Sequence, residues 1–217
     1  DATAFSDPNV ELGVQNGLAV VSLDGDDYFK ALHTYTTGSA FIVAKFDNTN
    51  WNFYDGLYGS GTDNSGTGQY FTGDGSGPGT DWSDEVTGGF HDSKWLNGTQ
   101  TITALTNPSA FNLYSGVDTT PNSFTSWTIG DDRNFGGTRA WEGDIAEVIV
   151  FDTALGEEDR RGVEVYLDEK WGLGQGLRAS FGEGNYNALA ASGDFSTVPE
   201  PSTYALLAGL TGLVCVM

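Results

Sequence analysis

Carboxylates far outnumber the cationic side chains in this sequence, and two kinds of chemistry would use them. The first is cleavage of a glycosidic bond, which needs two carboxylates that flank the bond. The nearest arrangement here is Asp144, Glu147 and Asp152. Their spacing does not place two acids on one face of a strand, and their neighbours are apolar. We therefore expect no catalytic residues, and expect Glu147 to anchor a turn or a helix.

The second kind of chemistry is the binding of a hard cation. Calcium takes roughly six to eight oxygen ligands, many of them from flexible loops. Aspartates in the glycine-rich loops supply such oxygens and predict a calcium site at one rim of the fold, although no loop matches the EF-hand pattern. The predicted ligands are Asp74, Asp81, Asp131 and Asp132, and a further acidic group near the start comprises Asp24, Asp26 and Asp27.

Aromatic side chains beside the polar loops could stack on sugar rings. The candidates are Trp51, Tyr54, Tyr58, Tyr70 and Trp82. The same residues could instead pack the loops against the body of the protein, and the sequence leaves both alternatives open. The histidines, His33 and His91, have no metal-ligand spacing with another His or Cys. We expect both histidines to be structural residues or surface residues.

The charge composition of the sequence limits which classes of partner the protein could bind. The 217 residues include 30 acidic and 9 basic side chains, a net charge of −21, which disfavours nucleic acid because phosphates call for Lys and Arg. It favours solubility, divalent cations or a salty milieu. The single cysteine, Cys215, allows neither a disulfide framework nor a cysteine-based metal site.

Short apolar runs between turn-forming residues predict an all-β protein, an antiparallel β-sandwich. The clearest run, Ile145–Phe151, alternates, with Ile145, Glu147, Ile149 and Phe151 on one face and Ala146, Val148 and Val150 on the other. Both faces are largely apolar, as in an inner strand. Asn97-Gly98 predicts a tight hairpin turn. The predicted strands are Leu18–Leu23, Ala40–Phe46, Trp51–Leu57, Thr99–Leu105, Ala110–Tyr114, Ser126–Ile129 and Ile145–Phe151.

One helix is predicted, at Glu157–Trp171, where Val163, Leu167 and Trp171 share a stripe and Gly172 provides a stop. It would cap the sandwich and complete a domain spanning residues 1–181. From 182 to 203 the periodicity fades, which predicts a linker. Residues 204–217 form an uncharged apolar tail that we expect to be helical.

The segment Gly143–Leu173 closely resembles the closing strand and helix of bacterial laminin-G-like domains, which are concanavalin A-like jelly rolls. In that family a Gly-x-Ile-x-Glu strand leads through an Ala-Leu turn to a helix ending near Lys-Trp-Gly. One departure is Gly156, where the family often has a Ser or Thr cap. The matching residues here are Gly143, Ile145, Glu147, Ala154, Leu155, Lys170, Trp171 and Gly172. The resemblance implies a jelly roll, often with calcium at a rim.

The tail resembles a PEP-CTERM sorting signal, carried by Pro199, Glu200 and Pro201 before the apolar run. That resemblance implies export, handling by an exosortase-like enzyme, and delivery to the cell surface or extracellular matrix. The chain opens at Asp1 without a basic or apolar leader, so an exported form would already have lost its signal peptide. The basic cluster that ends the family pattern is not present before Met217.

Fourteen helical residues span about 21 Å, short of the ~30 Å hydrocarbon core, so the tail must enter a membrane partly, be cleaved, or pack between subunits. Small residues at i,i+4 spacing suit close helix packing: Ala205, Ala208, Gly209 and Gly212. Together these features predict an exported, non-enzymatic surface or matrix protein that binds glycan or matrix polymer. The alternatives are a subunit of a homopolymeric filament or sheath assembled through the tail, and, less favoured, a glycoside hydrolase.

Overall fold

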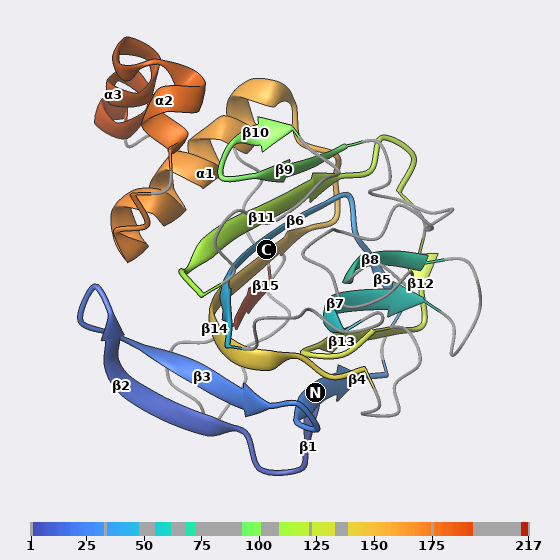
Figure 1. Ribbon diagram of the computed structural model, residues 1–217. Helices are drawn as coiled ribbons and strands as arrows, with labels where there is room; N and C mark the ends of the chain where they lie inside the picture. The colour runs from blue at the N-terminus through green and yellow to red at the C-terminus, as the bar shows by residue number, and fades with distance from the viewer. Residues whose placement is uncertain are drawn as a thin grey trace.

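The structure is a computed structural model, and it confirms a mostly β protein built from antiparallel sheets (Figure 1). It describes residues 2–32, 34–47, 55–61, 68–72, 93–100, 109–121, 123–132, 139–174, 176–192 and 214–216. The smaller sheet has the strand order β1 (Ala2–Phe5), β4 (Tyr28–Ala31), β13 (Ser126–Ile129), β7 (Gly56–Gly61), β8 (Gly68–Thr72).

The larger sheet contains the acidic residues Asp144 and Glu147. Its order is β10 (Thr99–Gln100), β9 (Lys94–Leu96), β11 (Asn112–Val117), β6 (Ser39–Phe46), β14 (Glu142–Phe151), β3 (Leu18–Asp24), β2 (Asn9–Gln15). Beside this path, β15 (Val214–Val216) pairs with β14. A separate ribbon joins β5 (Tyr35–Thr36) to β12 (Ser123–Phe124).

Two hydrophobic cores flank the larger sheet. The first lies between the sheets, where Phe29 and Ile129 of the smaller sheet join Ile42, Tyr114 and Val148 of the larger. The second lies on the opposite face of the larger sheet, beneath the helices. The central strands of the larger sheet are therefore buried on both faces, which explains why they read as nearly continuous apolar runs. The jelly-roll order of connections stays a prediction.

The central strand β14 departs from the simple alternation expected from its sequence. Its pairing with β6 shifts register between Ile145 and Glu147, which marks a β-bulge. Ile145 consequently joins Val148 and Val150 in the core between the sheets, whereas the sequence had placed Ile145 on the face of Glu147. Gly143 precedes the bulge with φ +147, and a Cβ there would lie 2.2 Å from the Lys45 carbonyl oxygen, so this position requires glycine.

Several local predictions are confirmed. Asn97 and Gly98 both have positive φ, 50° and 77°, as a two-residue hairpin turn between β9 and β10 requires. The helix α1 (Glu157–Trp171) has the predicted bounds and ends at Gly172 in the left-handed conformation. Gly156 precedes it without a side-chain cap, as the departure from the family pattern suggested. The apolar stripe of α1 packs on the second core.

The predicted linker is wrong over part of its length. Two further helices, α2 (Leu177–Phe181) and α3 (Glu183–Ser192), follow α1 and lie with it on one side of the larger sheet (Figure 1). Tyr186 is fully buried in the second core, and its hydroxyl donates to Asp168 Oδ2 of α1 (2.6 Å). A single buried aromatic thus fixes α3 to the body, although the surrounding Asn, Ala and Ser gave no amphipathic pattern.

The apolar tail is not helical where the structure describes it. Val214–Val216 forms β15, parallel to β14, so the expected helix over 204–217 is corrected for these three residues. The small-residue positions Ala205, Ala208, Gly209 and Gly212 lie outside the described residues, as do Pro199, Glu200 and Pro201. Within the described part of the chain, the helices are all too short or too polar to span a membrane.

Candidate functional site

Glu147 is the acid that a hydrolytic reading of the sequence would need, and it joins strand β14 to helix α1. Trp171 Nε1–H donates to Glu147 Oε2 at 2.6 Å, and Lys170 Nζ lies 2.8 Å from the carboxylate oxygens. Glu147 is 5 % exposed. Burial lowers the pKa of Lys170, but the hydrogen bond and charge of Glu147 outweigh it and raise this pKa above its ordinary value. The expected anchoring of the helix by Glu147 is confirmed.

The bulge turns Asp144 to the same face of the sheet as Glu147, since the two acids lie opposite Lys45 and Val43 of β6, so the expectation that no two acids share a strand face is wrong. Asp144, which is buried, pairs with Lys45 of β6 at 2.8 Å, and Lys45 in turn lies 2.9 Å from Asp47. Asp152 is exposed beyond the end of β14. Asp144 and Glu147 are thus each neutralised by a different lysine. The first ion pair links β14 to β6, and the second links β14 to α1. This arrangement does not resemble a pair of carboxylates that flank one bond.

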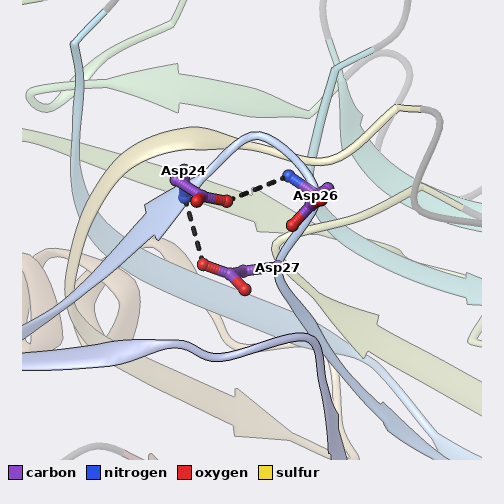
Figure 2. Close-up of side chains that lie close together, drawn as sticks. All are labelled: Asp24, Asp26 and Asp27. Carbon is purple, nitrogen blue, oxygen red and sulfur yellow. Dashed lines mark hydrogen bonds between the residues drawn. The ribbon is translucent and has the colours of Figure 1, made fainter.

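Three carboxylates converge in the short loop between β3 and β4 (Figure 2). Asp24 ends β3, Gly25 turns the chain with φ +97, and Asp26 and Asp27 lead into β4. Ligand oxygens of the three aspartates lie within 4.8 Å of one another. Asp24 and Asp26 are exposed, whereas Asp27 is only 2 % exposed. We call these three residues the aspartate loop.

Main-chain groups hold the aspartate loop in shape. Asp27 accepts the N–H of Asp7 at Oδ1 (2.8 Å) and the N–H of Asp24 at Oδ2 (3.2 Å), and Asp24 Oδ1 accepts the N–H of Asp26 (3.4 Å). Burial raises the pKa of Asp27, the two N–H donors partly oppose this rise, and the charge of Asp24 adds to it. Like charges are thus gathered here, and a hard divalent cation is the solute that would relieve their repulsion.

Two of the predicted calcium ligands are used within the fold. Asp131 and Asp132 are fully buried. Asp131 Oδ1 accepts the N–H of Asp132 (2.7 Å), and Asp132 Oδ2 forms an ion pair with Arg139 (2.7 Å). A Cβ on Gly56 would lie 2.2 Å from the Asp132 nitrogen, so β7 packs directly against this turn. Asp74 and Asp81 lie outside the described residues, so the predicted set of four stays a prediction.

Of the aromatic residues predicted to stack on sugars, some lie within the described part of the chain and the others lie outside it. Tyr58 is a core residue: it is 2 % exposed, its ring packs on Phe71, and its hydroxyl lies 2.8 Å from Thr37 Oγ1. The prediction that Tyr58 contacts glycan is therefore wrong, because β7 turns this side chain between the sheets. Tyr70 belongs to β8. Trp51, Tyr54 and Trp82, together with His33 and His91, lie outside the described residues.

A second buried carboxylate supports α1. Glu164 accepts the Ser115 hydroxyl and pairs with Arg160 at 2.6 Å, and the Arg160 guanidinium lies 4.1 Å from the Trp95 ring. Burial raises the pKa of Glu164 despite the opposing charge of Arg160. Both members of this i,i+4 pair are buried. The ladder from β9 through β11 to α1 is therefore held by charge as well as by apolar contact.

Comparison with known proteins adds no assignment: no family model, curated protein or solved structure matches this chain. The candidate site therefore rests on the geometry of its residues. Sequence reasoning noted Asp24, Asp26 and Asp27 but did not place them in the ligand set. The signal that distinguishes them is local, because an Asp-Gly-Asp-Asp turn between two strands leaves its side chains little room to diverge.

Proposed function

We propose that this chain is an exported, non-enzymatic protein of the cell surface or extracellular matrix, and that it binds glycan or another matrix polymer. The observation that carries the proposal is the Glu147 joint. The acid that a hydrolase reading would select on the closing strand is bound by Lys170 and Trp171 of α1. A carboxylate so engaged acts as a structural link, since both of its oxygens already accept hydrogen bonds from α1.

Export and location rest on the resemblance of the Pro199-Glu200-Pro201 segment to a sorting signal and on the charge of −21. A strongly acidic surface keeps a secreted protein soluble and favours divalent cations as partners. We propose calcium as that cation and the aspartate loop as the place it binds among the described residues, because three ligand oxygens already converge there.

The test is retention on immobilised polysaccharides, using the full chain, with calcium or with a chelator. The proposal expects retention on at least one matrix polymer. If sugar stacking contributes, Trp51→Ala and Trp82→Ala weaken retention, whereas Tyr58→Phe leaves it unchanged because the Tyr58 ring is buried. Failure of every polymer to retain the folded protein would overturn the binding role.

A second candidate is self-assembly through the tail, as in a filament or sheath. One observation favours it: Val214–Val216 pairs with a central strand of the body. A tail that can enter the sheet of its own domain has the chemistry to enter the sheet of an identical neighbour. Light scattering on the full chain and on a truncation ending at Ser192 tests this candidate, which expects association only of the full chain.

A further inference from the structure

Strand β14 has one edge that two different strands must share. Its pairing with β6 runs from Gly143 to Phe151, whereas β3 covers its other edge only from Glu142 to Ile145. Upstream of Val21, β3 pairs with β2 alone, through Val20 and Leu18. Among the described residues, β3 therefore leaves the second half of this edge of β14 to another strand. We call this edge, at Val148–Val150, the acceptor edge.

The main chain at the acceptor edge is oriented to receive a strand. The Phe151 carbonyl accepts the N–H of Gly38 (2.7 Å), on the side of β6. Because the polar groups of successive strand residues alternate between the two edges, those of Val148 and Val150 point away from β6. The Val150 carbonyl also accepts a hydrogen bond from the Tyr35 hydroxyl (3.2 Å). With β15 in place, Val148 is fully buried and Val150 is 4 % exposed, so the polar groups of this edge are paired there with the tail and not with bulk water.

The chain supplies that partner from its own tail. Val214, Cys215 and Val216 lie in parallel register against Val148, Ile149 and Val150. Two β-branched residues around an uncharged one suit a buried strand position. Figure 1 shows β15 beside β14. Residues 193–213, a count of 213 − 192 = 21, connect Ser192 at the end of α3 to Val214.

That connection is long enough to serve either of two acceptor edges. At about 3.3 Å per residue, twenty-one residues reach up to roughly 70 Å. A compact body of this length has a radius of gyration of about 17 Å, so a touching neighbour presents its own acceptor edge within reach. When copies are crowded, the acceptor edge of an identical neighbour competes with the chain's own edge for the strand.

We propose that two or more copies of this chain exchange their C-terminal strands, so that Val214–Val216 of one copy fills the acceptor edge of the next. The partner is a second copy of the same chain, and the contact is main-chain hydrogen bonding at β14. This inference rests on the proposed self-assembly and gives it a mechanism. It is independent of glycan or calcium binding. Exchange around a closed pair gives a dimer, and exchange in an open series gives a filament.

Trapping with disulfides tests the exchange, because Cys215 is the one cysteine in the sequence and lies opposite Ile149. A full-length chain with Ile149→Cys and Cys215→Ser carries a thiol only at the acceptor edge. It is mixed with unmodified chain in a thiol–disulfide buffer, and the cross-linked peptide is identified by mass spectrometry. The matched control carries Val43→Cys with Cys215→Ser, since Val43 is as buried as Ile149 but lies on β6, across β14 from the tail.

The proposal expects a mixed disulfide with the Ile149→Cys chain that increases with concentration, and little with the Val43→Cys control. Sedimentation of Cys215→Pro supplies a second readout, because proline removes the N–H of the central tail residue. It should abolish the association, and Cys215→Val should retain it. Association that is equal in Cys215→Pro and unmodified chain, without the mixed disulfide, overturns strand exchange but leaves assembly. A chain that stays monomeric at every concentration overturns both.

Discussion

The Glu147 joint and the aspartate loop use the same side-chain chemistry in opposite ways. At the joint, a buried carboxylate meets an ammonium and an indole N–H, both supplied by α1. In the aspartate loop, three carboxylates gather, main-chain N–H groups bind Asp27, and the charge of Asp24 raises the pKa of Asp27. The joint is complete within the fold, whereas Asp24 and Asp26 of the loop, drawn with Asp27 in Figure 2, are exposed.

The difference separates structural acids from acids that are free to bind a solute. A carboxylate whose counter-charge is built into the protein contributes to folding, and its removal leaves a buried partner without compensation. A carboxylate held beside other carboxylates costs the fold some free energy, which a divalent cation would recover. We therefore expect mutations at the joint to change stability and those in the loop to change the response to cations.

Removing the indole should have the largest effect. Trp171 is 2 % exposed, packs in the second core and donates to Glu147. Trp171→Ala should lower the free energy of unfolding by about 3–5 kcal/mol. Urea unfolding measures this loss, and Trp171→Phe is the control that keeps an aromatic ring while losing the N–H. A loss below about 1 kcal/mol for the alanine variant would show that α1 is held without this joint.

Removing the carboxylate should cost less. Glu147→Ala leaves Trp171 N–H and Lys170 without their acceptor, at about 2–3 kcal/mol, and Glu147→Gln should cost less because its amide oxygen still accepts. The raised pKa of Lys170 adds a pH dependence. Its stabilisation is fully present below the unfolded pKa of about 10.4 and is lost as pH rises through the higher folded pKa. Between pH 8 and 11 the free energy of unfolding should therefore fall more steeply for the unmodified chain than for Glu147→Gln. Parallel curves for the two proteins would contradict a stabilising Glu147–Lys170 pair.

The sequence anticipated the joint better than the aspartate loop, for a physical reason. Glu147 lies on strand β14 and Trp171 on helix α1, the next element along the chain. The periodicity of each element indicates which of its residues face the other. The bulge after Ile145 broke that logic within one strand, because one unpaired residue reverses every later face. Asp131 and Asp132 were misjudged because their burial depends on contacts with Gly56 and Arg139, which no local pattern shows. Tyr186 likewise holds α3 through a tertiary contact.

Calcium should act on the aspartate loop and leave the joint unaffected. At roughly ten to one hundred times its dissociation constant, a cation that binds only the folded state stabilises it by about 1.5–3 kcal/mol. For a chain of this length each kcal/mol raises the melting temperature by about 2–4 °C. The melting temperature should be higher by that amount in millimolar calcium than in chelator. Asp26→Asn should reduce this difference and leave the melting temperature in chelator unchanged. An unchanged midpoint in the unmodified chain would remove the calcium proposal.

Repulsion within the aspartate loop should give the smallest effect. Asp24→Asn keeps an oxygen to accept the Asp26 N–H but removes a charge that raises the pKa of Asp27. In chelator and low salt it should stabilise the fold by less than about 0.5 kcal/mol, because one of the groups is exposed. The gain should vanish in molar salt, where screening shortens the reach of the charge. Denaturant unfolding at two salt concentrations measures it, and a loss of stability would show that Asp24 is a structural acid after all.

The most direct test of the central claim asks whether this protein cuts polysaccharide or only binds it. The folded full chain is incubated with β-glucans and matrix polysaccharides, and released reducing ends are measured beside the fraction of polymer-bound protein. The account predicts binding without release, because Glu147 is engaged by Lys170 and Trp171. Release of reducing sugar that disappears in a folded Glu147→Gln variant would contradict it and make Glu147 a catalytic residue.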